Sequence, residues 1–300
     1  MKKVLALMLA FAMVFAFAAC DDGTTQHTVG GQIVVGSVTD LDANMLDGWT
    51  NGAQNAAIRS LIFGGATVTY TKEGEFEVDP YVAKSVESTE NDDGSKTYTI
   101  EIRDDLKWND EENTPITAED YVFSLLFYAS PEYASLDASD VHTYTNCYVG
   151  YEAYNSGESK TFQGIRLIDD HSFSVTITAE ELPYHYDIAY AAVDPLPMHD
   201  IAPDVTITDS ENGVTISDNY TSELLETTVN ANGAYRYLPQ VTYGPYQLES
   251  YDDSTKQAVL VINDNFLGTY DGVKPSIERI VLKTVNDATQ MDELEAGSVD

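Results

Sequence analysis

The chain has 300 residues, of which 43% are hydrophobic and 22% are charged, a composition typical of a folded protein. Its 50 acidic and 15 basic residues give a formal net charge of −35 at pH 7. Such a surface repels a phosphate backbone and has no basic stripe to neutralise it, which excludes nucleic-acid binding. The acidic residues are spread along the chain, so the charge indicates a solvated surface, and a preference for cationic ligands stays open.

The first twenty residues predict an export signal. Lys2 and Lys3 precede an uninterrupted apolar run of 16 residues, 4–19, and Cys20 follows it directly. A helix needs roughly 20 apolar residues to cross the hydrocarbon core of a bilayer, so this run is short for a membrane span. The pattern therefore favours a lipoprotein signal peptide over residues 1–20.

The residues around Cys20 resemble the bacterial lipobox. Ala18 and Ala19 are small residues directly before the cysteine, although Phe17 replaces the usual leucine. By this resemblance the Cys20 thiol receives a diacylglyceryl group and becomes the mature N-terminus, which acyl chains hold at the outer side of the cytoplasmic membrane. Residues 21–31 are polar and rich in Gly and Thr, which indicates a short tether between the lipid and the fold.

Cys147 is the only other cysteine. With Cys20 modified by lipid, Cys147 has no partner in the chain, so we expect no intramolecular disulfide. No neighbouring His or Lys pattern indicates an activated thiol. We interpret Cys147 as a small buried or half-buried side chain without a functional role.

The fold is expected to begin with a strand, a long loop and a helix. β-Branched residues alternate with others over 32–38, which predicts the strand. Asp, Asn and Gly are frequent over 40–52, which predicts the loop, and the apolar spacing over 54–63 predicts an amphipathic helix.

From about residue 67 the pattern changes to hairpins. Apolar and polar residues alternate over 84–88 and 96–103 on either side of the turn 91–94, and a second hairpin spans 165–177. Together with the helix that lies between them, these hairpins predict an α+β unit.

The helix between the hairpins is expected over 118–128. Thr117 can cap its free amides, and Asp120 occupies the third position of a start that resembles a capping box.

The last third of the chain is expected to be irregular first and regular later. Prolines punctuate Asp194-Pro195-Leu196-Pro197, and a polar region without clear periodicity runs to about residue 240. The elements expected after it are strands over 246–251, 258–263 and 277–283, a helix capped by Asp287 that ends at Ala296, and the start of another strand at Val299.

Six segments carry motifs that occur together in one family. The most specific is PITAEDYVFS at 115–124, which is close to the pattern P-x-TAEDVVFS. The others lie at 79–85, 96–108, 195–199, 244–248 and 293–300. In this order they resemble the extracellular solute-binding protein family of ABC importers, of the type that binds oligopeptides and dipeptides. The resemblance covers residues 31–300.

Two places depart from the pattern of that family. Residues 108–113 replace its W-x-DG-x turn with a longer, acidic one, and Thr242-Tyr243 precede Gly244 where the family often has small residues. We expect the conformation of these two loops to differ from that of the family.

The resemblance implies a periplasmic-binding-protein-like α/β fold of type II, with three domains and mixed sheets. Two lobes joined by a hinge close on a ligand between them, and the third domain is inserted in the first lobe. By this resemblance residues 32–70 and 182–300 form lobe one, and residues 71–181 form the inserted α+β domain. The second lobe is expected after Asp300 and is missing from this sequence.

The resemblance also implies a function. The protein is expected to capture short peptides outside the cytoplasmic membrane and to deliver them to an ABC permease, as a lipid-anchored monomer without a cofactor. Lobe one is expected to contribute the loop before the first helix and the turn that leads into the strand at 246. The expected ligand-binding residues are Trp49, Asn51, Tyr243, Gly244 and Tyr246. The residues that determine ligand specificity are divided between the two lobes, so this sequence leaves the identity of the ligand open.

Three other functions compare with this one. An enzyme is disfavoured because G-x-S-x-G, H-E-x-x-H, P-loop and G-x-G-x-x-G motifs are absent, and no catalytic residue is predicted. A nickel or metal-chelate binder of the same family stays open, although His142, His171, His185 and His199 lack the spacing of metal ligands and no metal ligand is predicted. A peptide-sensing surface lipoprotein independent of transport also stays open, because one fold serves both uses.

Overall fold

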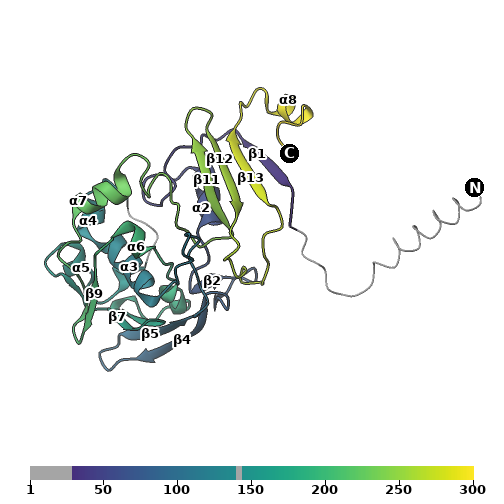
Figure 1. The fold of residues 1–300 in the computed structure, drawn as a ribbon. Helices are drawn as coiled ribbons and strands as arrows, with labels where there is room; N and C mark the ends of the chain where they lie inside the picture. Colours follow the sequence, from purple (N-terminus) through teal and green to yellow (C-terminus); the bar gives the residue numbers. More distant parts are fainter. Residues whose placement is uncertain (1–28, 140–143) are drawn as a thin grey trace, which may run out of the picture.

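The computed structural model describes residues 29–139 and 144–300 (Figure 1). The predicted signal peptide, the lipidation site at Cys20 and most of the predicted tether therefore lie outside the described residues. Within those two ranges, no helix is both long and apolar enough to cross a membrane. The strands of the described residues form four sheets, two of which have four strands.

One four-stranded sheet joins the beginning of the fold to its end. β1 (Gln32–Ser37) runs parallel to β13 (Arg279–Thr284), and the two are in register along their whole length. β12 (Gln257–Ile262) is antiparallel both to β13 and to β11 (Tyr246–Asp252), which gives the order β1-β13-β12-β11. The sheet is therefore mixed, as predicted.

Helix α2 (Ala53–Ile62) covers one face of this sheet (Figure 1). Its Ile58 and Ile62 side chains are buried in one apolar cluster with Leu248 of β11 and Leu260 of β12. Alternate residues of a strand point to the same face, so these strands offer the helix a continuous apolar surface. The burial of this surface holds the first helix on strands that lie almost two hundred residues later in the chain.

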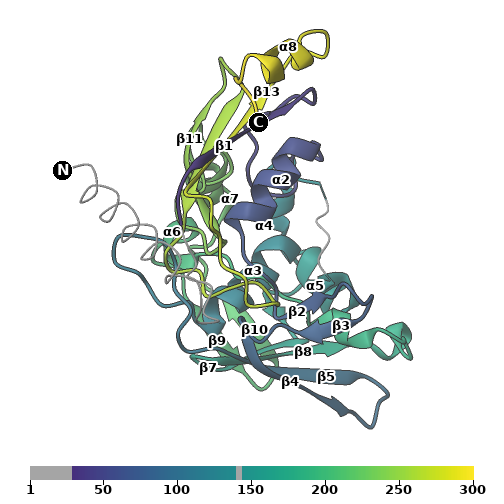
Figure 2. The same ribbon diagram turned by 90° about the vertical axis from the view of Figure 1, so that its right-hand side faces the viewer.

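A second four-stranded sheet is antiparallel throughout. It has the order β4-β5-β8-β7 and consists of β4 (Ala83–Glu90), β5 (Lys96–Ile102), β8 (Ser172–Ile177) and β7 (Ile165–Asp169). These strands are the two predicted hairpins, and the pairing of β5 with β8 joins them. In Figure 2 the β4–β5 hairpin lies at the bottom, far from α8 and the upper end of the first sheet.

Helix α3 (Ala118–Ala129) packs against this second sheet. Tyr121 stacks on Phe173 of β8, with the ring centroids 5.5 Å apart. The predicted capping box is present, and the Thr117 amide donates a hydrogen bond to the Asp120 carboxylate at 2.9 Å. Negative charge in the first turn also interacts favourably with the helix dipole. The helix therefore begins where the sequence predicts.

The remaining elements are short. They are β2 (Val68–Tyr70), β3 (Phe76–Val78), α4 (Pro131–Ala134), η1 (Thr145–Cys147), α5 (Tyr151–Asn155), β6 (Thr161–Phe162), η2 (Ala179–Glu181), η3 (Asp187–Ala191), α6 (Met198–Ile201), β9 (Ile207–Ser210), β10 (Gly213–Ile216), α7 (Ser222–Leu225), η4 (Glu226–Asn230) and α8 (Gln290–Glu295).

The prediction of an irregular region up to residue 240 is wrong. β9 and β10 form an antiparallel hairpin within it, and β10 also pairs with β6. Each strand of the hairpin has four residues, and β9 includes Asp209 and Ser210. The alternation of apolar and polar residues is therefore too short to be recognised in the sequence.

Two predictions near the C-terminal end are also wrong. Thr289 and not Asp287 occupies the N-cap position of α8, because the turn from Asn286 to Thr289 separates Asp287 from the first helical residue. Val299 is buried but lies in no strand. Its side chain lies against Gly36 of β1, and the backbone hydrogen bond to β1 comes from Asp300, whose amide donates to the Val34 carbonyl at 2.9 Å.

Two clusters of buried apolar residues make up the core of the described residues. The smaller lies between α2 and the β1-β13-β12-β11 sheet, and the larger surrounds α3. The buried apolar residues from Tyr190 to Tyr243 belong to the larger cluster, as do those of the β4-β5-β8-β7 sheet. Residues 190–243 thus pack with the predicted inserted domain, whereas the domain boundaries themselves stay a prediction.

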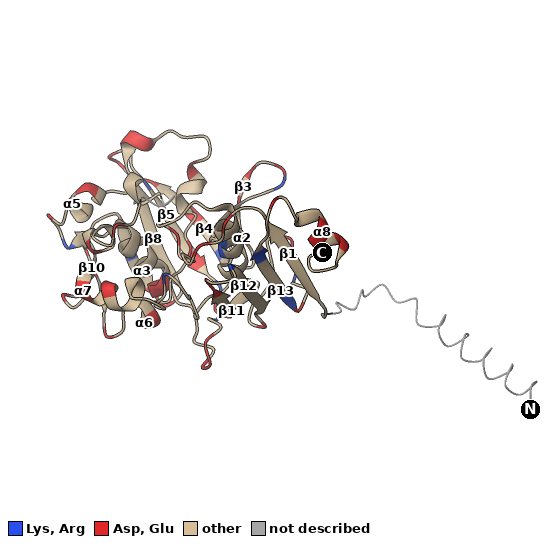
Figure 3. Ribbon diagram, turned by 90° about the horizontal axis from the view of Figure 1, so that it is seen from above, with Lys and Arg blue, Asp and Glu red and all other residues tan. Residues whose placement is uncertain are grey.

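Acidic residues lie on many elements at both ends of the molecule, among them α7 and α8 (Figure 3). Some of them form ion pairs, such as Asp209, which accepts hydrogen bonds from Arg166 Nε at 2.8 Å and from Arg166 Nη2 at 2.7 Å. The charge is therefore distributed over the surface, as the sequence indicates.

Candidate functional site

An open cavity of about 350 Å³ lies where the two packed units meet. The end of α2, the loop before it, α3, the proline-rich segment after η3 and the turn before β11 all contribute to its wall. The polar and aromatic residues that line it include Asp47, Arg59, Ser124, Tyr128, Asp194 and Tyr243. A concave, partly apolar site with a few polar groups is the usual form of a small-molecule site.

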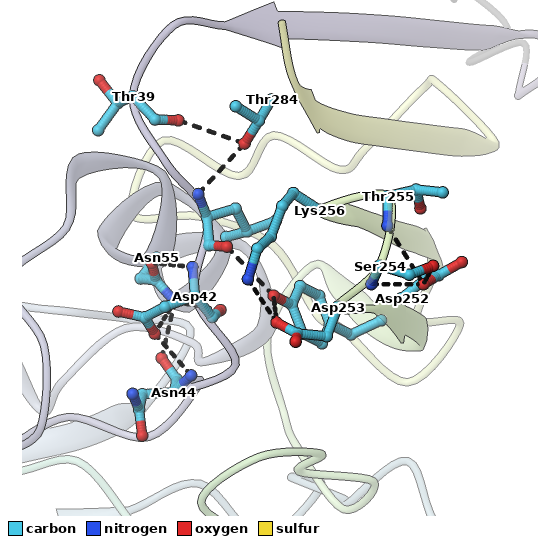
Figure 4. Close-up of polar contacts among 12 residues, drawn as sticks. Thr39, Asp42, Asn44, Asn55, Asp252, Asp253, Ser254, Thr255, Lys256 and Thr284 are labelled. Carbon is cyan, nitrogen blue, oxygen red and sulfur yellow. Dashed lines mark hydrogen bonds and ion pairs between the residues drawn. The ribbon is translucent and has the colours of Figure 1, made fainter.

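The loop before α2 is held in place by the buried side chain of Asn55. Its Nδ2 donates to the Asp42 carbonyl at 3.0 Å, to Asp42 Oδ1 at 3.1 Å and to the Asn44 carbonyl at 2.8 Å (Figure 4). Backbone groups of the same loop also bond to side chains of β11 and β13. The loop is thus fixed against both the helix and the sheet, and it presents a defined surface to the cavity.

Trp49 supports this loop through its packing. Its indole N–H donates to the Leu136 carbonyl at 3.1 Å, and its ring meets Tyr133 edge-on with centroids 5.5 Å apart. The guanidinium of Arg236 lies over the Trp49 ring, 4.6 Å from its centroid, and Arg236 Nε donates to Asn44 Oδ1 at 2.6 Å. A cation over an aromatic face is attracted by the ring quadrupole. Through these contacts Trp49 links its own loop to the segment 133–136 and to Arg236.

Arg59 and Asp47 form an ion pair on the cavity wall. Arg59 Nη2 lies 3.4 Å from Asp47 Oδ1 and donates to the Thr50 carbonyl at 3.3 Å. The other terminal nitrogen, Nη1, is buried and has no hydrogen-bond partner within the described residues. Arg59 lies in the last turn of α2, where a cation interacts favourably with the negative end of the helix dipole.

Asp194 also lines the cavity and accepts a hydrogen bond from the Tyr243 hydroxyl at 3.0 Å. Neighbouring protein atoms partly desolvate its carboxyl group, which raises the pKa of Asp194 to about 6, while the hydrogen bond from Tyr243 acts in the opposite direction. The residue is nevertheless exposed to the cavity, so water or a ligand reaches the carboxylate.

The backbone on both sides of Asp194 is fixed. Before it, the Val193 amide donates to Thr67 Oγ1 at 3.0 Å, and the Thr67 amide donates to the Val193 carbonyl at 3.1 Å. After it, the Leu196 amide donates to the Asp120 carbonyl at 3.2 Å. The proline that follows Asp194 also restricts this residue to extended conformations. The carboxylate therefore projects from a rigid segment.

Of the five ligand-binding residues expected from the sequence, Tyr243 lines the cavity. Gly244 follows it and lies against α2, where its amide donates to the Ile62 carbonyl at 2.8 Å. A Cβ atom at Gly244 would lie 2.5 Å from the Ile62 carbonyl carbon, so only glycine fits this contact.

The other three expected residues lie outside the cavity wall. Trp49 packs behind the loop, Asn51 is exposed at the surface, and Tyr246 is buried in the smaller core with its hydroxyl bonded to the Ile277 carbonyl at 2.9 Å. A role for them in ligand binding stays a prediction.

Three residues of the cavity were not singled out from the sequence, namely Arg59, Tyr128 and Asp194. Two of them had a signal. Arg59 is the only charged residue of α2, and Asp194 is the only charged residue in the apolar stretch 188–198. A lone charge in an apolar segment requires a specific environment, and here both charges face the same cavity. Tyr128 had no such signal, because an aromatic residue in an apolar helix is most often a packing residue.

The remaining candidates for chemistry have structural explanations. Cys147 is buried with a free thiol, which confirms the interpretation as a buried side chain, and burial raises the pKa of this thiol. Across residues 29–139 and 144–300, no three His, Cys, Asp or Glu side chains are grouped so that they could hold a metal ion.

The mixed sheet unit and the α+β unit with an open cavity between them agree with the class of periplasmic-binding-protein-like folds. The model of the bacterial extracellular solute-binding proteins, family 5 Middle, matches residues 77–300. The chain therefore belongs to the bacterial extracellular solute-binding proteins of family 5.

Curated relatives of this chain include two oligopeptide-binding proteins. The periplasmic oligopeptide-binding protein OppA of Salmonella typhimurium is 35% identical over 112 residues, which are 37% of this chain and 20% of that protein. The oligopeptide-binding protein OppA of Lactococcus lactis subsp. cremoris is 32% identical over 137 residues, 45% of this chain and 22% of that protein. The aligned part thus spans about a fifth of each relative.

Solved structures share the fold over most of the chain. Lactococcal OppA complexed with an endogenous peptide in the closed conformation matches 91% of this chain and 45% of that chain, with a TM-score of 0.64 and 20% identity. Listeria monocytogenes OppA bound to peptide matches 91% and 46%, with a TM-score of 0.62 and 20% identity. The predicted fold class is confirmed, and the chain spans less than half the length of these structures.

Proposed function

We propose that the protein is the substrate-binding component of an ABC transporter, which captures short peptides outside the cytoplasmic membrane and delivers them to a permease. The observation that carries the proposal is the open cavity, set in a fold that is also that of OppA structures bound to peptide. Its wall combines aromatic rings, an ion pair and a carboxylate, which suits a ligand with a polar backbone and varied side chains.

In the proposed mechanism the peptide binds in an extended conformation. Main-chain hydrogen bonds supply affinity, and hydrated pockets tolerate different side chains. Closure of the protein around the ligand would then create the surface that a permease recognises. The chain aligns with less than half of each solved relative, so the cavity is proposed as one part of the whole site.

We further propose that lipid on Cys20 anchors the protein outside the membrane and that the protein is a monomer without enzymatic activity. Mass spectrometry of the mature N-terminal peptide tests the anchor, because Cys20 should carry acyl chains. The variant Cys20→Ser should be released from membranes into the soluble fraction. Retention of this variant on membranes would contradict the anchor.

Peptide capture is tested by calorimetry with the full-length gene product. Peptides that copurify are released by acid and identified by mass spectrometry, and one of them is titrated into protein freed of ligand. Ser60 lines the cavity from an exposed position of α2, so Ser60→Trp should fill the cavity and weaken binding at least tenfold. Ala57→Trp on the same helix is exposed away from the cavity and should bind as the parent does.

The same titration tests the alternative of a metal-chelate ligand. A periplasmic EDTA-binding protein, EppA, matches 91% of this chain with a TM-score of 0.60 and 18% identity, so the fold also accommodates chelates. If a nickel–EDTA complex binds and no peptide does, the peptide proposal is wrong and the chelate alternative replaces it. Loss of peptide uptake after deletion of the gene would distinguish transport from sensing.

A further inference from the structure

The two carboxylates of the cavity differ in their partners. Asp47 is paired with Arg59 at 3.4 Å. Asp194 accepts one hydrogen bond, from the neutral hydroxyl of Tyr243, and no Lys, Arg or His in the described ranges forms an ion pair with it. The Asp194 carboxylate is open to the cavity and has no cation partner there, so a positive charge supplied by a ligand would interact favourably with it.

Aromatic residues accompany this carboxylate. Tyr243, Tyr128 and Phe63 line the same cavity, and Tyr243 is in direct contact with Asp194. Aromatic faces attract cations, and the attraction is stronger where water is partly excluded. A carboxylate beside aromatic rings is therefore a combination that suits an ammonium or guanidinium group.

We propose that Asp194 forms a subsite for a cationic group of the ligand, an ammonium or a guanidinium, in the cavity between α2 and α3. This inference rests on the proposed function, because it specifies which peptides the same site prefers. The group is the side chain of a Lys or Arg residue of the peptide.

Two further observations support this subsite. The backbone around Asp194 is held by Thr67 and Asp120, so the carboxylate is already in place before a ligand binds and little entropy is lost. The formal charge of −35 raises the concentration of cations near the surface and favours their approach to such a site. The raised pKa of Asp194 agrees with a carboxylate that lacks a cation.

The experiment compares matched peptides on the full-length gene product by calorimetry. Four-residue peptides carry either Lys or norleucine, its uncharged analogue, at each position in turn, and each is made with a free or an acetylated N-terminus. Asp194→Asn removes the charge and keeps the shape of the side chain. Asp92→Asn, at an exposed turn far in sequence from the cavity segments, removes the same charge elsewhere.

The parent protein should bind the cationic peptide roughly tenfold more tightly than its uncharged partner, the usual size for a hydrogen bond to a charged group. Asp194→Asn should lose this preference and keep its affinity for the norleucine peptide, which also verifies that the cavity is intact. Asp92→Asn should keep the preference. The preference should depend on the position of the Lys residue and should survive acetylation of the N-terminus, because the side chain occupies the subsite.

Two results would overturn the inference. If peptides bind but the parent shows no preference, or Asp194→Asn retains it, the cationic subsite is wrong and peptide capture stands. If no peptide binds the parent at all, peptide capture is wrong and the subsite falls with it.

Discussion

Three hydrogen bonds join Asn109 to Thr242. The Asn109 amide donates to the Thr242 carbonyl at 3.1 Å, the Thr242 amide donates to Asn109 Oδ1 at 2.7 Å, and Asn109 Nδ2 donates to Thr242 Oγ1 at 3.1 Å. Next to them, Trp108 meets Tyr243 edge-on with ring centroids 5.5 Å apart. These are the two places where the sequence departs from the family pattern, so the two departures form one contact, and this contact positions Tyr243 on the cavity.

Replacement of Asn109 by alanine should lower the free energy of unfolding by about 1–3 kcal/mol, because the partly buried groups of Thr242 lose their partners. Urea denaturation measures the loss. Asn212 lies exposed in the β9–β10 turn, and Asn212→Ala should change stability by less than about 0.5 kcal/mol. Equal stabilities of the two variants would show that the contact contributes little.

Gly244→Ala should destabilise the protein by about 1–3 kcal/mol or prevent folding, because the added Cβ would overlap the Ile62 backbone, which cannot move without α2. Thermal unfolding followed by circular dichroism measures the effect. Gly30→Ala is the control, since a Cβ there meets nothing within 4 Å. A Gly244→Ala protein as stable as the Gly30→Ala protein would contradict the close approach.

Asp120 should make the stability depend on pH. Burial raises the pKa of Asp120 to about 6, although hydrogen bonds from the amides of Thr117 and Met198 act in the opposite direction. A carboxyl group with a raised pKa contributes stability that is fully present below about pH 4 and is lost as the pH rises through 6. The stability of the parent minus that of Asp120→Asn should therefore fall by about 2 kcal/mol between pH 4 and pH 7.

Urea titrations at pH 4, 5, 6 and 7 measure this difference. Asp209 supplies a control of opposite sign, because its hydrogen bonds with Arg166 lower the pKa of this carboxyl group. Its contribution is present at neutral pH and is lost as the pH falls, so the difference between the parent and Asp209→Asn should rise with pH. If the stability difference between the parent and Asp120→Asn also rises with pH, the folded protein stabilises the charged carboxylate, and the pKa of Asp120 is not raised.

Cys147 should react slowly with thiol reagents in the folded protein, because the side chain is buried and its pKa is raised. In the variant Cys20→Ser it is the single thiol of the chain. Labelling with iodoacetamide should be at least tenfold slower in buffer than in urea when normalised to a model thiol. Equal rates in the two conditions would mean that the thiol is accessible.

The parts of the fold that could be predicted have local signals. Thr117 and Asp120 mark the start of α3, and alternation marks β4, β5, β7 and β8, because capping and strand periodicity involve residues that are close in sequence. The hairpin of β9 and β10 was missed since its strands are short, and their pairing with β6 depends on residues far away in the chain.

The residues of the cavity were harder to predict from local sequence than the helices and strands. Tyr243 was found through a motif that the chain shares with a family, whereas Tyr246 of the same motif serves the core. Arg59 and Asp194 lie 135 positions apart and meet only after folding. A single charged residue in an apolar segment indicates that its side chain is not simply packed in the core. The sequence does not indicate that the side chains of Arg59 and Asp194 line the same cavity.

The pairing of β1 with β13 also determines when the fold can be completed. Of the strands that the structure describes, β1 is synthesised first and its partner β13 last, whereas the strands of the β4-β5-β8-β7 sheet find their partners much earlier. Closing so long a loop is entropically costly and slow. Until residue 284 has left the ribosome, β1 lacks its partner and α2 lacks the complete sheet on which it packs. The wall that α2 provides therefore depends on a strand that is synthesised long after α2 itself.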